Sequence, residues 1–170
     1  MLTQFTTRAV NATDVSAIEA LHARAFGPGR FARTAYRVRE GLPAFSPRCR
    51  LAMSEGLIVA AVRMAPVQIG GEPGVQLLGP LAVEPPLKGQ GIGKALVAEA
   101  LEGAVEAGER LAILVGDLPY YQRFGFAIAP PGRFDLGGPV DPARLLYHEL
   151  LPGVLTDYLG LVRADYARAS

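Results

Sequence analysis

The sequence predicts one α/β domain built on a mixed, mostly antiparallel sheet that contains one parallel pair of strands. Three apolar strands are expected in succession, at residues 50–54, 57–69 and 75–83, and the glycine-containing turns between them favour an antiparallel meander. A helix at 93–107 and a strand at 111–115 follow. Because a crossover of helical length joins strands that run parallel, we expect the strand at 111–115 to run parallel to the strand at 75–83.

Length and composition are those of a single compact domain. The chain has 170 residues, of which 50% are apolar, and its formal net charge is +1 from 17 basic and 16 acidic side chains. We therefore treat residues 1–170 as one domain, with no basic field that would recruit nucleic acid or an anionic membrane. No apolar run approaches the roughly 18–20 residues that cross a bilayer, and no secretory leader is evident, so we expect a cytoplasmic location. The single cysteine, Cys49, excludes an internal disulfide and is expected to be buried or half-buried.

The N-terminal part of the chain is expected to contribute one strand and two helices. Residues 2–10 alternate weakly as a strand, and cap oxygens at residues 11–14 precede a helix that ends near Phe26, before Gly27 and Pro28. Residues 31–40 are expected to form the second helix. Four arginines lie in or near that segment, and a solvated helix face explains them more simply than an acidic substrate does: Arg30, Arg33, Arg37 and Arg39.

The turn between the strand at 75–83 and the helix at 93–107 has the composition of a phosphate-binding loop. It reads Lys-Gly-Gln-Gly-Ile-Gly-Lys over residues 88–94. Glycines let the backbone approach a ligand without interference from Cβ atoms. The first N–H groups of the following helix have no partner within the helix, and together with the helix dipole they favour an anion.

Two common phosphate loops do not match this segment. A P-loop requires Ser or Thr after the lysine to bind magnesium, and Ala95 follows Lys94. A dinucleotide loop requires a third glycine where Lys94 stands. An NTP-binding protein is therefore disfavoured, whereas a turn whose glycines merely link a strand to a helix remains an alternative.

Two motifs in this order resemble the GNAT N-acetyltransferases. Residues 88–93 are similar to the acyl-CoA pyrophosphate loop Q/R-x-x-G-x-G/A, with Lys88 where the family has Gln or Arg. Residues 118–126 are similar to the later F-Y-x-x-x-G-F signature, in a P-x-Y-Y-x-R-F-G-F form that looks like a branch of predicted acyltransferases. The resemblance is close over 78–126 and looser over 7–26. It implies helices on both faces of the sheet and acetyl-CoA as cosubstrate.

Gly79 and Pro80 fall inside the strand that leads into the loop. A proline removes a ladder N–H and a glycine favours a bulge, so this strand should part from its parallel neighbour there. In the family, that gap holds the pantetheine arm of the cofactor. The resemblance assigns cofactor binding to the end of the strand and to the loop: Leu81, Ala82, Val83, Lys88, Gly89, Gln90, Gly91, Ile92, Gly93 and Lys94.

Acyl transfer to an amine needs a stabilised oxyanion and a protonated leaving group. The resemblance makes Tyr121 the acid that protonates the departing thiolate, and it makes the Leu81 amide the oxyanion donor. Tyr120 is expected to pack as the aromatic residue before it. No step on this path requires a metal.

The base is not identified by the sequence. Glu84, Asp117 and His148 are candidates, and each is explained more simply as a solvated or structural group. Water can carry the amine proton away instead. His22 is expected to be structural, and Arg123 is expected to be solvated or paired with a carboxylate.

These observations predict an N-acetyltransferase in which the amine attacks acetyl-CoA directly within a ternary complex. A non-catalytic module that binds acyl-CoA for regulation is the alternative. The acceptor is left open among a small amine, a peptide N-terminus, a lysine and an aminoacyl group, and the chain is expected to be a monomer or a homodimer. Residues 130–142, rich in Gly and Pro, form a loop expected to set specificity.

Overall fold

A computed structural model describes residues 2–169, with the side chains of residues 31 and 32 excepted. Its main sheet is mixed, and within the strand path β4 and β5 form the parallel pair while the other neighbours are antiparallel. Strand β9 (Gly160–Ala164) extends the sheet beside the far half of β3, and β7 (Phe134–Asp135) pairs with β9. The strand path is β1 (Thr6–Ala9), β2 (Arg50–Ser54), β3 (Leu57–Ile69), β4 (Glu72–Val83), β5 (Leu111–Val115), β8 (Leu145–Glu149) and β6 (Ala127–Ile128).

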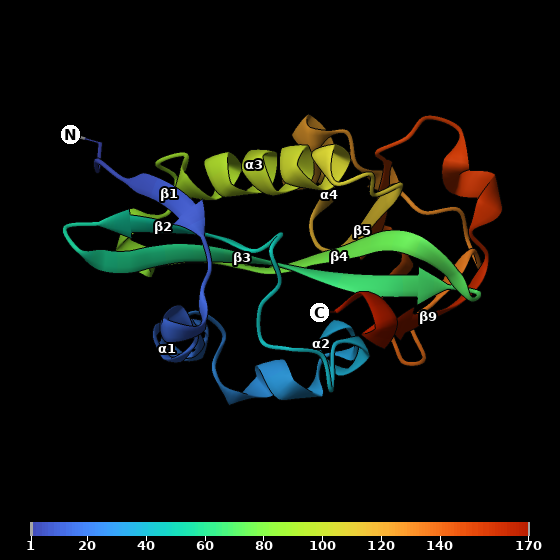
Figure 1. Ribbon diagram of the computed structural model, residues 1–170, viewed down its shortest axis with the longest axis horizontal. Helices are drawn as coiled ribbons and strands as arrows, with labels where there is room; N and C mark the ends of the chain where they lie inside the picture. Colours follow the sequence, from blue (N-terminus) through green and yellow to red (C-terminus); the bar gives the residue numbers. More distant parts are fainter. Residues whose placement is uncertain (1, 170) are drawn as a thin grey trace.

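Helices cover both faces of this sheet. Helix α3 (Ile92–Glu106) runs along one face, and α1 (Val15–Phe26) and α2 (Thr34–Val38) lie on the other (Figure 1). A short helix, α4 (Leu118–Tyr121), follows β5. The architecture confirms the predicted mixed sheet with a parallel pair and helices on both sides.

The sheet separates the hydrophobic cluster beneath α1 from the cluster beneath α3, because neighbouring residues of a strand point to opposite faces. In β2, Leu51 belongs to the cluster beneath α1, whereas Ala52 belongs to the cluster beneath α3. Helix α3 contributes Leu96 and Ala100 at helical spacing, and both are buried. Cys49 is 2% exposed and lies in the α1 cluster, which confirms the expected burial.

Three elements differ in extent from the sequence expectation. The first strand covers only Thr6–Ala9, because an edge strand extends only along its partner, and here that partner ends at Ser54. The second helix is only Thr34–Val38, because Arg33 has extended backbone that separates it from a 3₁₀ turn at Pro28–Ala32. Strand β4 begins at Glu72 rather than at 75, since Gly70 and Gly71 alone make the hairpin turn, both with positive φ.

The expected bulge lies at Gly79 and Pro80. Val62 pairs with Leu81 and Met64 pairs with Leu78, so two residues of β4 lie opposite Arg63 alone. The parallel pairing of β4 with β5 covers Val75–Leu77 and stops before the bulge. The predicted parting of the two strands is therefore confirmed.

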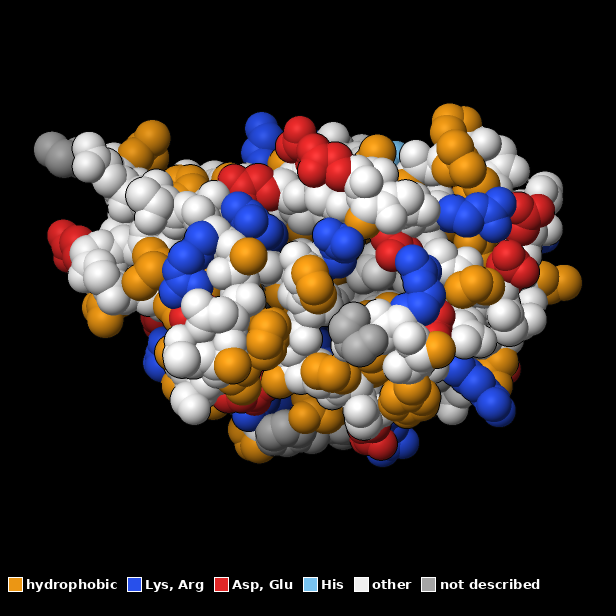
Figure 2. All heavy atoms as spheres, in the orientation of Figure 1, with side chains coloured by type: hydrophobic (Ala, Val, Ile, Leu, Met, Phe, Trp, Pro, Cys, Tyr) orange, Lys and Arg blue, Asp and Glu red, His pale blue; other side chains and the backbone are white. Residues whose placement is uncertain are grey.

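The surface is mixed in charge. On the face shown in Figure 2, basic and acidic side chains are interspersed among hydrophobic ones, in line with the nearly neutral composition. Within residues 2–169, none of the helices combines the length and apolar character needed to cross a membrane.

Candidate active site

A groove of about 810 Å³ runs from the bulge of β4 to the first turn of α3. The residues expected to bind the cofactor mostly line it: Leu81, Val83, Lys88, Gly89, Gly91, Ile92, Gly93 and Lys94. Two of the expected residues lie elsewhere. Ala82 is buried in the cluster beneath α1, and the Gln90 side chain accepts a hydrogen bond from the Thr3 N–H at 2.7 Å.

The glycines give the loop its shape at the start of α3. Gly89 and Gly91 have φ of 81° and 84°, a left-handed conformation that favours glycine, and Gly91 is the N-cap of the helix. Ala95 N–H donates to Gly91 O at 3.0 Å. The amides of residues 92–94 lie in the turn before that bond, where a helix has no internal acceptors for them. These amides lie at the N-terminal, positive end of the helix dipole, which is the arrangement that favours a bound anion.

The last residues of β4 direct alternate amides to opposite sides. Glu84 N–H donates to Val59 O of β3 at 2.8 Å. Because N–H directions alternate along a strand, the Ala82 amide also faces β3, while the amides of Leu81 and Val83 face away from it. These two amides therefore point toward the opening where β4 has left β5.

Both tyrosines of the later motif line the groove. Tyr120 packs on Tyr121 and Phe124 as expected, with ring centroids 4.9 and 5.9 Å apart. Its hydroxyl also lies so close to the start of α3 that a Cβ on Gly93 would come within 2.9 Å of it. The Tyr121 ring packs against Gly116 and makes an edge contact with Phe126, with centroids 6.0 Å apart.

Burial raises the pKa of Tyr121 to about 12, and the neighbouring Tyr120 and Asp117 add to the rise while Arg144 opposes it. The Tyr121 hydroxyl therefore keeps its proton at neutral pH. A hydroxyl in this state can donate a hydrogen bond or a proton to a developing anion.

The three candidate bases have different surroundings. Arg24 binds both oxygens of Glu84, at 3.1 and 2.9 Å, and this contact lowers the pKa of that carboxyl. His148 packs on Phe126 and does not line the groove, and burial lowers its pKa. Asp117 lines the groove, is exposed, and lies 3.3 Å from Arg144. None of the three has the environment of an evident base.

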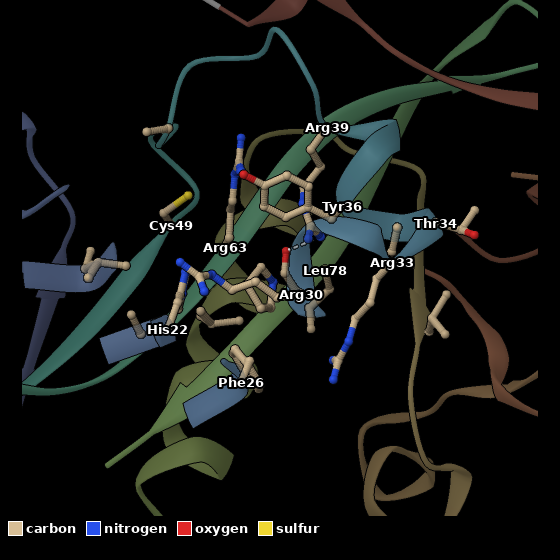
Figure 3. Close-up of a pocket in the computed structure, with 18 of the residues that line it drawn as sticks. His22, Phe26, Arg30, Arg33, Thr34, Tyr36, Arg39, Cys49, Arg63 and Leu78 are labelled. Carbon is tan, nitrogen blue, oxygen red and sulfur yellow. Dashed lines mark hydrogen bonds between the residues drawn. The ribbon is translucent and has the colours of Figure 1, made fainter. Parts of the chain in front are cut away.

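A second cavity, of about 370 Å³, lies on the α1 and α2 side of the bulge (Figure 3). It meets the groove where β4 parts from β5. The residues that line both cavities are Phe26, Arg33, Leu78, Gly79, Pro80, Val115 and Arg144. His22, expected to be structural, is buried in the wall of this cavity and has its pKa lowered by burial.

Arginines are prominent in the second cavity. Arg39 is 7% exposed and donates to Gly79 O at 2.7 Å, so the expectation of a solvated arginine face is wrong for this residue. Burial, and then the charge of Arg63, lower the pKa of Arg39 to about 10. Arg63 could not be identified from the sequence, because nothing in an apolar strand pattern shows which residue faces a bulge on the next strand. Arg37 is exposed, as expected.

Comparison with known proteins gives the family. The family model described as an acetyltransferase (GNAT) domain matches residues 6–129. The uncharacterized N-acetyltransferase YhbS of Escherichia coli strain K12 is 31% identical over 157 residues, covering 88% of this chain and 89% of YhbS. Its crystal structure in complex with CoA superposes with a TM-score of 0.81 at 28% identity, over 97% of this chain and 92% of that one.

A second solved structure has the same fold and a similar level of identity. A GNAT family acetyltransferase from Brucella melitensis, in complex with acetyl-CoA, is 30% identical with a TM-score of 0.65, over 86% of this chain and 97% of that one. The matched family model covers strands β1 to β6, the glycine-rich loop before α3 and the tyrosine motif described above. The chain belongs to the GNAT acetyltransferase family.

Proposed function

We propose that this chain is an N-acetyltransferase that transfers the acetyl group of acetyl-CoA to a primary amine within a ternary complex. The observation that carries the proposal is the junction of two cavities at the β4 bulge, where Leu78, Gly79 and Pro80 line both. A donor in the groove and an acceptor in the second cavity would meet there. The relatives crystallised with CoA and acetyl-CoA support the choice of cosubstrate.

The groove suits the chemistry of CoA. The pyrophosphate would bind the amides of residues 92–94, with Lys88 and Lys94 supplying positive charge at the same end. The pantetheine arm is an extended chain with amide groups. It would lie along β4 and pair with the outward-facing main chain of Leu81 and Val83, as an added strand does.

The reaction proceeds by direct attack. The neutral amine forms a C–N bond to the thioester carbon, and the carbonyl oxygen becomes an oxyanion that accepts a hydrogen bond from Leu81 N–H. As the C–S bond breaks, the Tyr121 hydroxyl gives its proton to the sulfur, and solvent restores that proton afterwards. The amine proton leaves through water, so the mechanism needs no side-chain base.

Two measurements test the proposal. Thermal unfolding with acetyl-CoA, CoA and ATP-magnesium should show stabilisation by the CoA species alone, since a ligand at 100 times its Kd adds about 2.7 kcal/mol. Thiol release with a panel of amines should then reveal turnover. We expect Tyr121→Phe to lower kcat by about 100-fold or more while the acetyl-CoA shift persists, because a positioned acid contributes this much.

Tyr147→Phe is the matched control, because Tyr147 lies on β8 outside both cavities and should keep full activity. No stabilisation by any CoA species would refute the proposal. Stabilisation without turnover of any amine would favour the non-catalytic binding module. Full activity of Tyr121→Phe would remove Tyr121 from the mechanism.

A further inference from the structure

We propose that the acceptor is a small primary amine that also carries a carboxylate, and that Arg39 and Arg63 bind this carboxylate in the cavity beside the bulge. The inference rests on the proposed function, since it names the class of amine that is acetylated. It concerns the same site and adds a specificity determinant to it.

The charge of the cavity is strongly unbalanced. Among the described residues that line it there are five arginines, and the carboxylates are Glu19 and Asp141. Within residues 2–169, neither Arg39 nor Arg63 has a carboxylate within 4 Å. The arginines that line the cavity are Arg30, Arg33, Arg39, Arg63 and Arg144.

Arg39 and Arg63 each donate a hydrogen bond to a main-chain carbonyl, and each has further N–H groups that could bind an anion. Arg39 donates one bond to Gly79 O at 2.7 Å, and its buried Nε has no hydrogen-bond partner among the residues that the structure describes. Arg63 donates to Pro43 O at 2.9 Å. An anion between the two guanidinium groups would satisfy further donors and offset the repulsion of two neighbouring cations in a poorly solvated wall.

The arginines come from separate elements. Figure 3 shows Arg30, Arg39 and Arg63 grouped around the Tyr36 ring, whereas Arg33 extends away from them. Arg30 lies in the 3₁₀ turn before α2, Arg39 follows α2, and Arg63 lies opposite the bulge on β3. Folding thus gathers charges that are far apart in sequence.

Size and geometry favour a small carboxylate. A cavity of about 370 Å³ is at the lower end of the range for small-molecule sites, too small for a folded partner. Planar guanidinium groups match the two oxygens of a carboxylate. Because Arg39 binds Gly79 O, the anion would lie next to the junction of the cavities, and an amino group a few bonds away would reach the thioester.

Matched pairs of acceptors test the inference. Amino acids are compared with their carboxamides, which keep the amine and lose the charge, and kcat/KM is measured by thiol release. We expect a preference for the acid of roughly 10- to 150-fold, the value of hydrogen bonds to a charged group. Arg63→Gln should lower that preference toward unity, mainly through KM, with the acetyl-CoA affinity unchanged, and Arg63→Lys should restore part of it.

Arg37→Gln is the matched control, because Arg37 lies on the exposed side of the same region, outside the cavity. It should leave the preference intact. Phosphoethanolamine compared with ethanolamine forms a second arm. A preference for the phosphate without one for the carboxylate would overturn the choice of carboxylate.

A binding measurement separates this inference from the proposed function. N-acetylated amino acids at 100 times their Kd should raise the melting temperature by roughly 5–11 °C, the corresponding carboxamides should not, and Arg63→Gln should abolish the rise. If amines are acetylated without any preference for acids, the inference is wrong and the proposed function stands. If acids bind through Arg63 but no amine is acetylated, the anion site stands and the proposed function is wrong.

Discussion

Gly93 lies where the phosphate loop, β4 and the tyrosine motif come together, and Gly93→Ala tests that packing. An added Cβ would lie 2.9 Å from the Tyr120 hydroxyl oxygen, and 3.4 Å from Leu81 Cδ2 and Val83 Cγ2. The first distance is shorter than real Cβ contacts, whereas the other two are ordinary. The substitution should therefore displace the Tyr120 ring from the wall of the groove.

The same helix provides a matched control. Gly103 lies in α3, and apart from the neighbouring backbone of the helix no described atom lies within 4 Å of an added Cβ. Gly103→Ala therefore gains helix propensity without a clash and should stabilise by about 0.5–1 kcal/mol. Gly93→Ala gains propensity too but overpacks the loop, which typically costs about 1–3 kcal/mol. Since a kcal/mol shifts Tm by about 2–4 °C at this size, Gly93→Ala should melt roughly 2–12 °C below Gly103→Ala.

Thermal unfolding and the Kd for acetyl-CoA measure the two consequences of the substitution. We expect Gly93→Ala to weaken acetyl-CoA binding, and Gly103→Ala to leave it unchanged. Adding Tyr120→Phe to Gly93→Ala removes the clashing oxygen and should recover part of the lost stability, as a positive coupling in a double-mutant cycle. Equal stability and equal Kd for the two alanine variants would refute this account of the loop.

Two further predictions concern charge. Lys88→Ala should weaken acetyl-CoA binding by roughly two- to fivefold at low salt and by less at high salt, because Lys88 is exposed at the groove. Lys88→Arg should keep the affinity for acetyl-CoA. A loss of affinity that does not depend on salt would contradict an electrostatic role for Lys88. Burial lowers the pKa of both His22 and His148 below the unfolded value of about 6.5, so their contribution to stability is complete above that pH and is lost as the pH falls through the folded pKa values. Urea unfolding between pH 7.5 and 5 should therefore show a smaller loss of stability in the His22→Gln/His148→Gln variant than in the unmodified protein. An identical loss would show that these two histidines do not cause the loss of stability at low pH.

Much of the site was accessible from local sequence. Apolar periodicity located β2, β3, β5 and α3, and the glycines of residues 89–93 located the helix start that we propose binds the pyrophosphate. Gly79 and Pro80 marked the bulge. These features depend on the backbone conformation and on the spacing of apolar side chains within a short segment, and both can be predicted from consecutive residues.

Other features of the site depend on which segments fold against one another. The Tyr120 hydroxyl approaches Gly93 only because α4 packs beside the start of α3. The Gln90 side chain accepts a hydrogen bond from Thr3 N–H, since the segment before β1 lies beside the loop. No spacing within a motif specifies such contacts, because they form between residues distant in sequence.

By itself, the sequence determined the parallel strand pair and the bulge before the loop, because both follow from the local order of glycines, prolines and apolar residues. Its two motifs also determined the resemblance to the family and to the loop that we propose binds CoA. Only the tertiary structure decided that Arg39 is buried on Gly79 and that Arg63 lies opposite the bulge. In the sequence both read as ordinary charged residues. Their meeting in one cavity depends on β3–β4 register and on how the segment after α1 closes over the sheet, and long-range packing sets both.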